Sequence, residues 1–154
     1  MSSGAFVRRV DAGAFVRNPQ VQVAVSIDTA YVAGNGGSKL TRGVYLVDNQ
    51  LNDGSTGEGG MALHTRCPIG SLIGFSSYPI DTGSGDSVAI TGFSIVQGSV
   101  FGGSGYPIEY SEGYWIGQAM YGGSQTYQIQ FCVTSGALRP VKFYTSVECQ
   151  LTAQ

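Results

Sequence analysis

Two segments of this 154-residue chain alternate apolar and polar residues with a period of two, and this alternation constrains the fold more than any other feature. In residues 21–27, valines and an isoleucine occupy every second position, with Gln22, Ala24 and Ser26 between them. Residues 141–152 repeat the pattern over a longer run. Successive side chains of a β-strand point to opposite faces, so this period indicates a strand with one buried face. Both segments are therefore predicted to be strands that cover a core.

Further strands are predicted at six places between these two segments. They span residues 43–48, 61–65, 72–78, 87–96, 114–121 and 126–133. The connecting segments are rich in glycine, asparagine and aspartate, which tolerate the positive φ angles of tight turns. No segment keeps a 3.6-residue apolar period over two or more turns. The sequence therefore predicts an all-β single domain, an antiparallel β-sandwich or a jelly-roll-like barrel.

The chain carries little charge. Charged residues make up only 12% of it, about half the share found in ordinary soluble domains. The formal net charge is −2 and the longest basic run is Arg8-Arg9, so the basic surface that binds phosphate backbones is absent, and we expect no nucleic-acid partner. Because a weakly charged surface repels its copies weakly, we expect the protein to form a homo-oligomer, with a two-fold dimer as the commonest form.

Residues 1–20 are predicted to form an N-terminal arm or short hairpin, followed by one domain over residues 21–154. Residues 4–8 and 13–17 both read Gly-Ala-Phe-Val-Arg. Each copy offers one apolar side chain to a sheet, so we expect the arm to pack as a strand against a sheet edge of its own subunit or of a neighbour. No continuous apolar stretch marks a signal peptide or a membrane span, and we expect a bacterial cytoplasmic protein with no membrane partner.

Residues suited to catalysis or metal binding are few. His64 is the only histidine and is in phase with Ala62, which predicts a position on the less apolar face of its strand. Cys67, Cys132 and Cys149 are widely spaced and form no C-x-x-C pair, which predicts reduced structural thiols. One histidine and three widely spaced cysteines supply too few clustered ligands to predict a zinc site, and they do not indicate a nucleophile–histidine pair. We expect no metal, no cofactor and no catalytic residue.

Acidic loops and exposed aromatic residues supply the candidate ligand-binding positions. These candidates are Asn49, Asp53, Asp81, Asp86, Tyr106 and Tyr110. The first four lie in two turn-rich loops that do not follow the alternating ligand rhythm of a calcium loop, so ordinary turn chemistry is the simpler interpretation. The two tyrosines lie in a region crowded with aromatic rings, which combine apolar area with a polar tip as sugar-binding faces do. Trp115, in the same region, is expected in the core.

Several short motifs follow one another in a distinctive order from residue 27 onward. They are Ile27-Asp28-Thr29, Gly43-Val-Tyr-Leu-Val47, Gly57-Glu-Gly-Gly-Met-Ala-Leu63, Gly70-Ser-Leu-Ile-Gly-Phe75, Ser87-Val-Ala-Ile90, Tyr114-Trp115 with Gln118-Ala119, and Thr126-Tyr-Gln-Ile-Gln-Phe131. Their order and spacing resemble the AidA/PixA family of bacterial inclusion-body proteins over roughly 130 residues. Ser71 stands where that family usually has aspartate, and Gly74-Phe75 replaces its Arg-Trp pair. The chain therefore resembles a distant member.

The resemblance implies a β-sandwich protein that accumulates in the cytoplasm as inclusions or under quorum-sensing control, in bacteria that interact with hosts. It supplies no catalytic residues. We therefore expect a non-enzymatic, self-associating protein linked to bacterium–host interaction. The alternative is a lectin-like carbohydrate-binding module, with or without calcium, in which the candidate loops and tyrosines hold a glycan. A glycoside-directed enzyme would need paired carboxylates whose acid and base roles the sequence does not identify.

Overall fold

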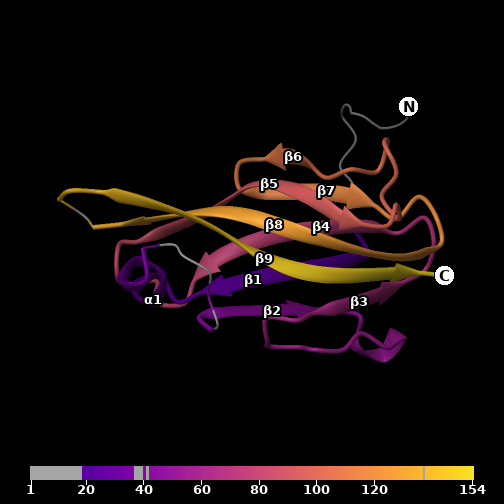
Figure 1. Ribbon diagram of the computed structural model, residues 1–154, viewed down its shortest axis with the longest axis horizontal. Helices are drawn as coiled ribbons and strands as arrows, with labels where there is room; N and C mark the ends of the chain where they lie inside the picture. The colour runs from indigo at the N-terminus through magenta and orange to yellow at the C-terminus, as the bar shows by residue number, and fades with distance from the viewer. Residues whose placement is uncertain (1–18, 37–39, 41, 137) are drawn as a thin grey trace.

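A computed structural model describes residues 19–36, 40, 42–136 and 138–154 of the chain (Figure 1). The predicted arm, residues 1–20, lies outside these residues except for Pro19 and Gln20. The described part of the chain contains nine strands, one short α-helix and one 3-10 turn. Strands therefore dominate the structure, as the alternation in the sequence predicts.

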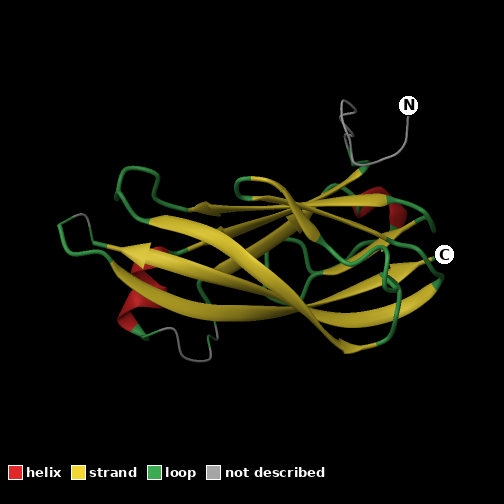
Figure 2. Ribbon diagram, turned by 90° about the horizontal axis from the view of Figure 1, so that it is seen from above, coloured by secondary structure: helices red, strands yellow, loops and turns green. Residues whose placement is uncertain are grey.

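The strands form two sheets that face each other, which Figure 2 shows as two layers. The five-stranded sheet contains, in spatial order, β2 (Val44–Asp48), β1 (Val21–Ile27), β4 (Leu72–Pro79), β7 (Tyr114–Gln118) and β6 (Ile108–Ser111). The four-stranded sheet contains β3 (His64–Cys67), β9 (Val141–Ala153), β8 (Gly123–Ser135) and β5 (Ser87–Gln97). The prediction of an all-β sandwich is confirmed.

Each sheet contains one parallel pair of strands. β1 runs parallel to β4, and β3 runs parallel to β9. The other pairings between the described strands are antiparallel, as predicted, and β8 with β9 is the longest of them. Alternation identifies a strand and its buried face, but it carries no information about the direction of the neighbouring strand. The parallel pairs were therefore not visible in the sequence.

A short helix, α1 (Thr29–Gly34), follows β1. Asp28 caps it, because the Asp28 carboxylate accepts a hydrogen bond of 3.1 Å from the main-chain N–H of Tyr31. Six residues make fewer than two helical turns, so this helix leaves no apolar period long enough to be recognised in the sequence. A single 3-10 turn, η1 (Leu51–Asp53), follows β2.

Two strand predictions need correction. The strand expected at residues 61–65 is β3, which begins only at His64. Before it, Gly60 forms an isolated bridge to β2, in which the Leu46 N–H donates a hydrogen bond of 2.9 Å to the carbonyl of Gly60. β6 was not predicted at all. Its four residues are all exposed, so they show no apolar alternation.

The core lies between the two sheets. Every second residue of β1 is buried, from Val21 to Ile27, which confirms the face predicted for this strand. Aromatic rings fill the centre, with 4.8 Å between the ring centroids of Phe75 and Phe93 and 5.5 Å between those of Phe101 and Tyr127. Edge-to-face pairs of this kind contribute roughly 0.5–1.5 kcal/mol beyond the area they bury. The core is thus held by aromatic contacts between the layers as well as by aliphatic strands.

Trp115 packs against this core from β7 and remains partly exposed. Its ring centroid lies 5.6 Å from that of Phe93. The indole N–H is buried and has no hydrogen-bond acceptor among the described residues. Trp115 therefore packs against the core, as expected, but it lies at the edge of the core and not at its centre.

The three cysteines are buried and are free thiols. Cys149 lies in phase with the buried residues Val147 and Leu151 of β9, as its position in the sequence predicts. Burial raises the pKa of the Cys149 thiol to about 12. This thiol therefore stays protonated at neutral pH and acts as a small apolar group.

Candidate functional site

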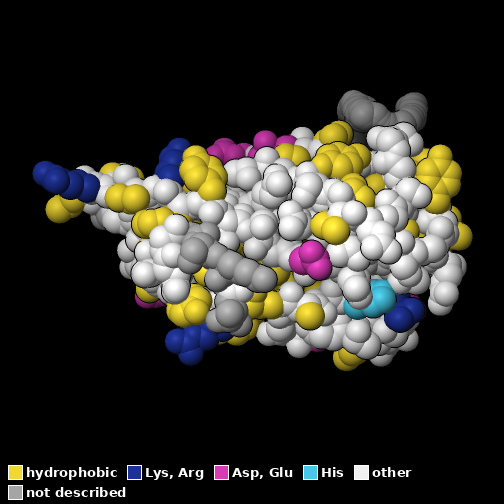
Figure 3. Space-filling view, in the orientation of Figure 1, with side chains coloured by type: hydrophobic (Ala, Val, Ile, Leu, Met, Phe, Trp, Pro, Cys, Tyr) yellow, Lys and Arg dark blue, Asp and Glu magenta, His cyan; other side chains and the backbone are white. Residues whose placement is uncertain are grey.

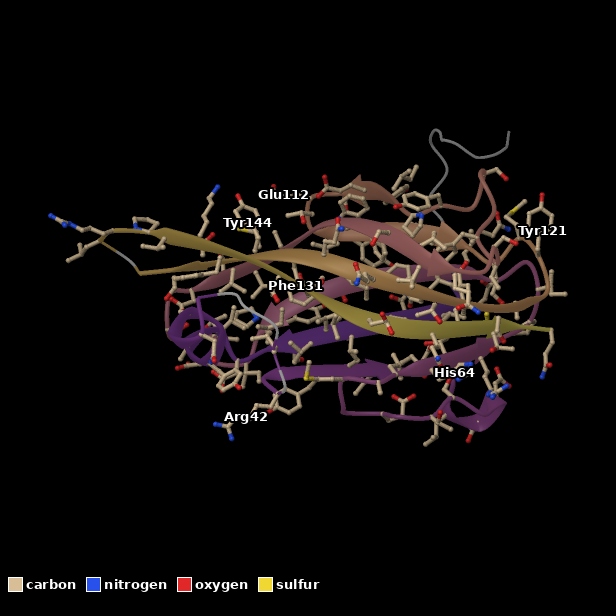
Figure 4. The ribbon with its side chains drawn as sticks, viewed as in Figure 1. Arg42, His64, Glu112, Tyr121, Phe131 and Tyr144 are labelled. Atoms are coloured by element: carbon tan, nitrogen blue, oxygen red, sulfur yellow. The ribbon has the colours of Figure 1, made fainter. Side chains whose placement is uncertain are left out.

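An open groove of about 560 Å³ lies beside the first half of β9. It is lined by Leu40, Met61, Gln128, Tyr144, Thr145, Ser146, Val147 and Glu148. Five of these residues are consecutive in β9, and Figure 4 shows the side chain of Tyr144 on that strand. The groove therefore follows one strand over five consecutive residues.

The groove exists because β9 is much longer than the strand beside it. β9 has 13 residues, whereas β3 has four and pairs only with residues 150–153 of β9. The residues just before β3 leave the edge of β9, since the main chain at Gly60 bonds to β2. Between residues 141 and 149, the described part of the chain therefore offers β9 a neighbouring strand only on the β8 side.

Main-chain groups of β9 point into this groove. The Gln150 N–H donates a hydrogen bond of 3.0 Å to the Leu63 carbonyl, which shows that Gln150 directs its main chain toward the β3 side. Every second residue of a strand directs its N–H and C=O to the same edge. Tyr144, Ser146 and Glu148 therefore present these groups to the groove, and no described residue bonds to them there. Such an edge is a template for one more strand.

The side chains of the groove combine an apolar floor with a polar rim. Leu40 and Val147 are buried, and Met61 packs partly buried against the same core. Gln128 lies directly opposite Glu148 in the pairing of β8 with β9. Among the lining residues that the structure describes, Glu148 is the one with a charged side chain. The groove therefore suits a segment that carries an apolar side chain on one face and a basic side chain on the other.

Among the predicted ligand-binding residues, Asn49 and Asp53 stabilise the turn after β2. Asn49 Oδ1 accepts a hydrogen bond of 2.9 Å from the Gln22 N–H, and Asn49 Nδ2 donates one of 2.9 Å to the Gln20 carbonyl. The Asp53 carboxylate accepts a hydrogen bond of 2.6 Å from the Gln50 side chain. Asn49 thus ties β2 to the start of β1, and Asp53 acts within its own turn.

Asp81 and Asp86 lie in the loop between β4 and β5. Asp81 Oδ1 accepts a hydrogen bond of 3.0 Å from the Gly83 N–H in the same turn. Asp86 Oδ2 accepts one of 2.7 Å from the Thr29 hydroxyl of α1, and its Oδ1 accepts one of 3.3 Å from the Gly136 N–H. The Thr29 hydrogen bond is the main reason that the pKa of Asp86 lies below its ordinary value, because it stabilises the carboxylate. Asp86 therefore fastens three segments together.

Tyr106 and Tyr110 lie on either side of the start of β6. The Tyr106 hydroxyl donates a hydrogen bond to the Phe93 carbonyl, and its ring lies edge-on to Phe101 at 6.5 Å between centroids. Tyr106 thus fastens the loop before β6 to β5. Tyr110 is an exposed residue of β6, at the edge of the five-stranded sheet.

The structure does not bring the six candidates into one site. Near the start of β1, Val23 pairs with Asp48, the residue before Asn49. At the end of β1, Ile27 lies beside Pro79, two residues before Asp81. The two loops are therefore separated by the length of a seven-residue strand, roughly 20 Å. Figure 2 shows the helical turns η1 and α1, one beside each loop, at opposite ends of the molecule. The two tyrosines lie at a third place, at the β6 edge.

His64 lies on the outer face of β3, where the sequence predicts it (Figure 4). Its Nε2 lies 2.6 Å from the Thr152 hydroxyl oxygen, which lies 2.7 Å from the hydroxyl oxygen of Ser124. Burial, and secondly the charge of Arg66, lower the pKa of His64 below its ordinary value, so the ring is neutral at pH 7. The chain of hydrogen bonds links β3, β9 and β8 and has a structural role.

Asp48 and Glu58 form a carboxyl pair at the end of β2 that was not among the predicted site residues. Glu58 Oε1 accepts a hydrogen bond of 2.8 Å from the Asp48 N–H, and Asp48 Oδ2 accepts one of 2.7 Å from the Thr65 hydroxyl. Burial, and secondly the Asp48 carboxyl, raise the pKa of Glu58 above its ordinary value. Within the described residues, no group of three or more His, Cys, Asp or Glu side chains is arranged to hold a metal ion.

The groove itself was also missed in the sequence. The strand predicted at residues 61–65 is much shorter than the alternating run at 141–152, but the sequence does not show that these two strands pair. A long strand paired with a short one must leave part of its edge uncovered. Which part is uncovered depends on the register, and the sequence pattern does not contain the register.

A second surface is the outer face of the five-stranded sheet, which carries no charged side chain among its described residues. The strand register places on it Gln22, Ala24, Ser26, Tyr45, Val47, Leu72, Gly74, Ser76, Tyr78, Ile108, Tyr114, Ile116 and Gln118. The Tyr114 phenol lies over Gly74, where a Cβ atom would overlap it, and donates a hydrogen bond of 3.1 Å to Gln22 Oε1. The described residues of this face, the neutral face, therefore include no charge.

Comparison with known protein families assigns most of the sequence to one family. The profile of a family described as a domain of unknown function, DUF8788, matches residues 19–138, which is well over half of the chain. The chain belongs to the DUF8788 family. The match begins at the first described residue, and β9 lies beyond its end. No curated protein matches this DUF8788 chain.

Comparison of structures identifies the fold. The DUF8788 chain is similar to the crystal structure of the inclusion body protein PixA from Burkholderia cenocepacia J2315, with a TM-score of 0.70. The two chains are 18% identical, and the alignment covers 93% of this chain and 100% of PixA. The predicted resemblance to the AidA/PixA family is thus confirmed at the level of the fold. No helix among the described residues of the DUF8788 chain is long and apolar enough to span a membrane.

Proposed function

We propose that this protein is a non-enzymatic β-sandwich that associates with itself and accumulates in the bacterial cytoplasm as dense assemblies. The observation that carries the proposal is the neutral face, whose described residues include no charge. Exposed sheet faces of monomeric proteins usually carry charges that keep them in water. The likeness in fold to PixA, an inclusion body protein, supports the same role.

The occupant of the neutral face is a second copy of the chain. Five strands of four to eight residues, at a spacing of about 4.8 Å and a rise of about 3.3 Å per residue, span roughly 460 Å² of sheet. This area is of the same order as the ~800 Å² that each partner buries in a standard protein–protein interface. When two copies pack through this face across a two-fold axis, the described residues of the face bury no charged group, so no desolvation of charge opposes the contact. Tyr45 and Tyr78, both exposed there, add aromatic area with polar tips.

Light scattering of the purified protein at micromolar concentration tests this proposal. The expected mass is at least twice the 16.1 kDa of one chain. A mass of 16.1 kDa would overturn it. Sedimentation velocity on the same sample separates a closed dimer from larger assemblies.

A link to bacterium–host interaction under quorum-sensing control stays a prediction from the AidA/PixA resemblance. The carbohydrate-binding alternative also stays a prediction, and a glycan array with and without calcium tests it. The six candidate residues occupy three separate places, which does not favour this alternative. Four of them, Asn49, Asp53, Asp81 and Asp86, already accept hydrogen bonds from their own turns or from neighbouring strands and helices.

A further inference from the structure

Residues 57–60, in the connection between β2 and β3, lie along the outer edge of β2. In Figure 1 this connection runs along the lower side of the molecule. The Leu46 N–H donates a hydrogen bond of 2.9 Å to the Gly60 carbonyl, and the Leu46 carbonyl accepts one of 2.6 Å from the Gly59 N–H. The next outward N–H of β2, that of Asp48, donates one of 2.8 Å to Glu58 Oε1. This segment, the edge cover, therefore occupies the position of one more strand beside β2.

Glu58 is the only residue of the edge cover with a side chain, because the other three are glycines. Its carboxylate replaces the carbonyl that a neighbouring strand would offer to the Asp48 N–H. The chain just before the cover is held by β3, since Thr56 and His64 exchange two main-chain hydrogen bonds. Two main-chain hydrogen bonds and one carboxylate therefore fasten the cover to β2, and it stays attached to β3 without them.

The carboxyl groups of Asp48 and Glu58 are in contact at this edge. Asp48 Oδ2 accepts a hydrogen bond of 2.7 Å from the Thr65 hydroxyl, and Asp48 Oδ1 accepts one of 2.8 Å from the Gln50 N–H. Glu58 Oε2 is buried and has no hydrogen-bond partner among the described residues. Two carboxylates in contact repel each other unless they share a proton. A proton on Glu58 gives its buried oxygen a partner, the Asp48 carboxylate.

We propose that residues 57–60 form a proton-dependent cover over the β2 edge, closed while Asp48 and Glu58 share one proton and released when that proton passes to water. Release leaves the N–H groups of Leu46 and Asp48 and the Leu46 carbonyl without partners. A sheet edge recruits another strand through unpaired groups of this kind. The cover does not involve the neutral face, and its test is independent of whether that face forms a dimer.

The groups around the pair set the direction of the response to pH. Burial, and secondly the Asp48 carboxyl, raise the pKa of Glu58 above its ordinary value. A group whose pKa is raised in the closed arrangement stabilises that arrangement below its ordinary pKa, and this contribution is lost as the pH rises through the raised value. The cover is therefore closed in acid and is released as the pH rises.

The other ionisable side chains nearby do not reverse this direction. Burial raises the pKa of the Cys67 thiol, so the thiol stays neutral over the range in which carboxyl groups titrate. Thr65 is buried, and His64 and Arg66 alternate with it along β3, so they point to the outer face of that strand. The Asp53 carboxylate of η1 accepts a hydrogen bond from the Gln50 side chain. The remaining nearby charge is thus either turned outward or already bonded.

Amide hydrogen exchange of the full chain, read by mass spectrometry, tests the inference between roughly pH 4 and 8, the range in which a carboxyl group with a raised pKa titrates. Exchange rates are divided by the intrinsic rate at each pH, which leaves a protection factor. We expect the protection of Leu46 and Asp48 to fall about threefold or more as the pH rises, because opening of the cover releases the shared proton. Protection at Ile129, inside the β8–β9 pair, should stay constant. Constant protection at β2, or an equal fall at Ile129, would overturn the inference.

Glu58→Gln replaces the shared proton by a permanent donor. The amide oxygen still accepts from the Asp48 N–H, and the amide nitrogen donates to the Asp48 carboxylate. We expect protection at Leu46 to be independent of pH and about threefold or more above that of the wild type at pH 8. The matched control is Glu112→Gln, which removes the same charge from the exposed turn between β6 and β7 and should keep the wild-type response. A response that survives in Glu58→Gln, or is lost in Glu112→Gln, would overturn the inference.

Thr65→Val distinguishes a shared proton from a purely structural contact. The Thr65 hydroxyl stabilises the ionised form of Asp48, so its removal makes the pair hold its proton more strongly. We expect the midpoint of the protection change to move to higher pH, and the titration of the Glu58 carboxyl carbon by NMR to move with it. A general loss of stability lowers protection at every pH but leaves this midpoint in place. A midpoint that stays unchanged or moves to lower pH would overturn the inference.

Discussion

The outer faces of the two sheets follow the same alternation and differ in charge. The neutral face of the five-stranded sheet has no charged residue among the described ones. The outer face of the four-stranded sheet carries His64, Arg66, Lys142 and Glu148. Figure 3 shows this second face, with basic, acidic and histidine side chains set among uncharged ones.

Alternation alone therefore does not decide whether a face stays in water. Both faces are outside the core, and both carry serine, glutamine and tyrosine. Charged groups resist burial because they lose their hydration, so a face that carries them stays solvated unless partners are supplied. The neutral face meets no such cost, and the Tyr114 phenol occupies the space above Gly74 on it. The comparison therefore separates a docking face from a solvated one.

The largest expected effect comes from charging each face in turn. Ala24 and Ser76 are direct neighbours across β1 and β4 on the neutral face. Replacing both, Ala24→Lys with Ser76→Lys, is expected to weaken dimerisation by about 100-fold or more, because the interface would bury unpaired like charges. Sedimentation equilibrium measures the dissociation constant.

The matched control is a lysine pair on the other face. Thr126 and Gln150 are direct neighbours across β8 and β9. Thr126→Lys with Gln150→Lys is expected to change the dissociation constant less than about threefold, because surface charges in water contribute little. If this pair disrupts the dimer and the first pair does not, the assignment of the two faces must be reversed.

A smaller effect is expected from adding one methyl group to a glycine of each face. Gly74→Ala would displace the Tyr114 phenol and break its hydrogen bond to Gln22. We expect Tm to fall by about 3–6 °C, as for a loss of one to two kcal/mol in a domain of this size. On the other face, a Cβ at Gly92 would lie 3.2 Å from the flexible Gln130 side chain, and we expect a change within about 2 °C. Calorimetry compares them, and equal losses would contradict the special role of Gly74.

The response to pH sharpens the comparison further. Burial, more than any neighbouring group, raises the pKa of Tyr114 above its ordinary value of 10.0. The phenol is thus neutral below that raised value, and the stability it contributes is lost only as the pH rises through it. We expect the dimer to persist from pH 7 to 10 and to dissociate above, with Tyr114→Phe dissociating at higher pH. Scattering mass against pH measures this, and dissociation between pH 7 and 9 would contradict it.

The smallest expected effect is that of salt on the dimer. Contacts between uncharged side chains are not screened, so the dimer dissociation constant should change less than about twofold between roughly 0.05 and 0.5 M NaCl. Sedimentation equilibrium at each salt concentration measures this dissociation constant. A strong salt dependence would mean that the charged face of the four-stranded sheet forms the interface.

Local pattern was sufficient for the strands whose burial alternates. The sequence by itself determined β1 to the residue, the long final strand, the buried cysteines and the outward position of His64. It also determined the low charge, and with it the expectation of self-association. These properties follow from the period of side chains along one strand and from composition, so no distant segment is needed to predict them.

Tertiary structure decided everything that depends on which strands lie side by side. It set the parallel pairs, the late start of β3 at His64 and therefore the groove beside β9. It separated Asp53 from Asp86 by the length of β1 and joined Asp48 to Glu58. The physical reason is that register and direction are fixed by contacts between residues far apart in the chain, and a one-strand pattern is the same for every possible neighbour.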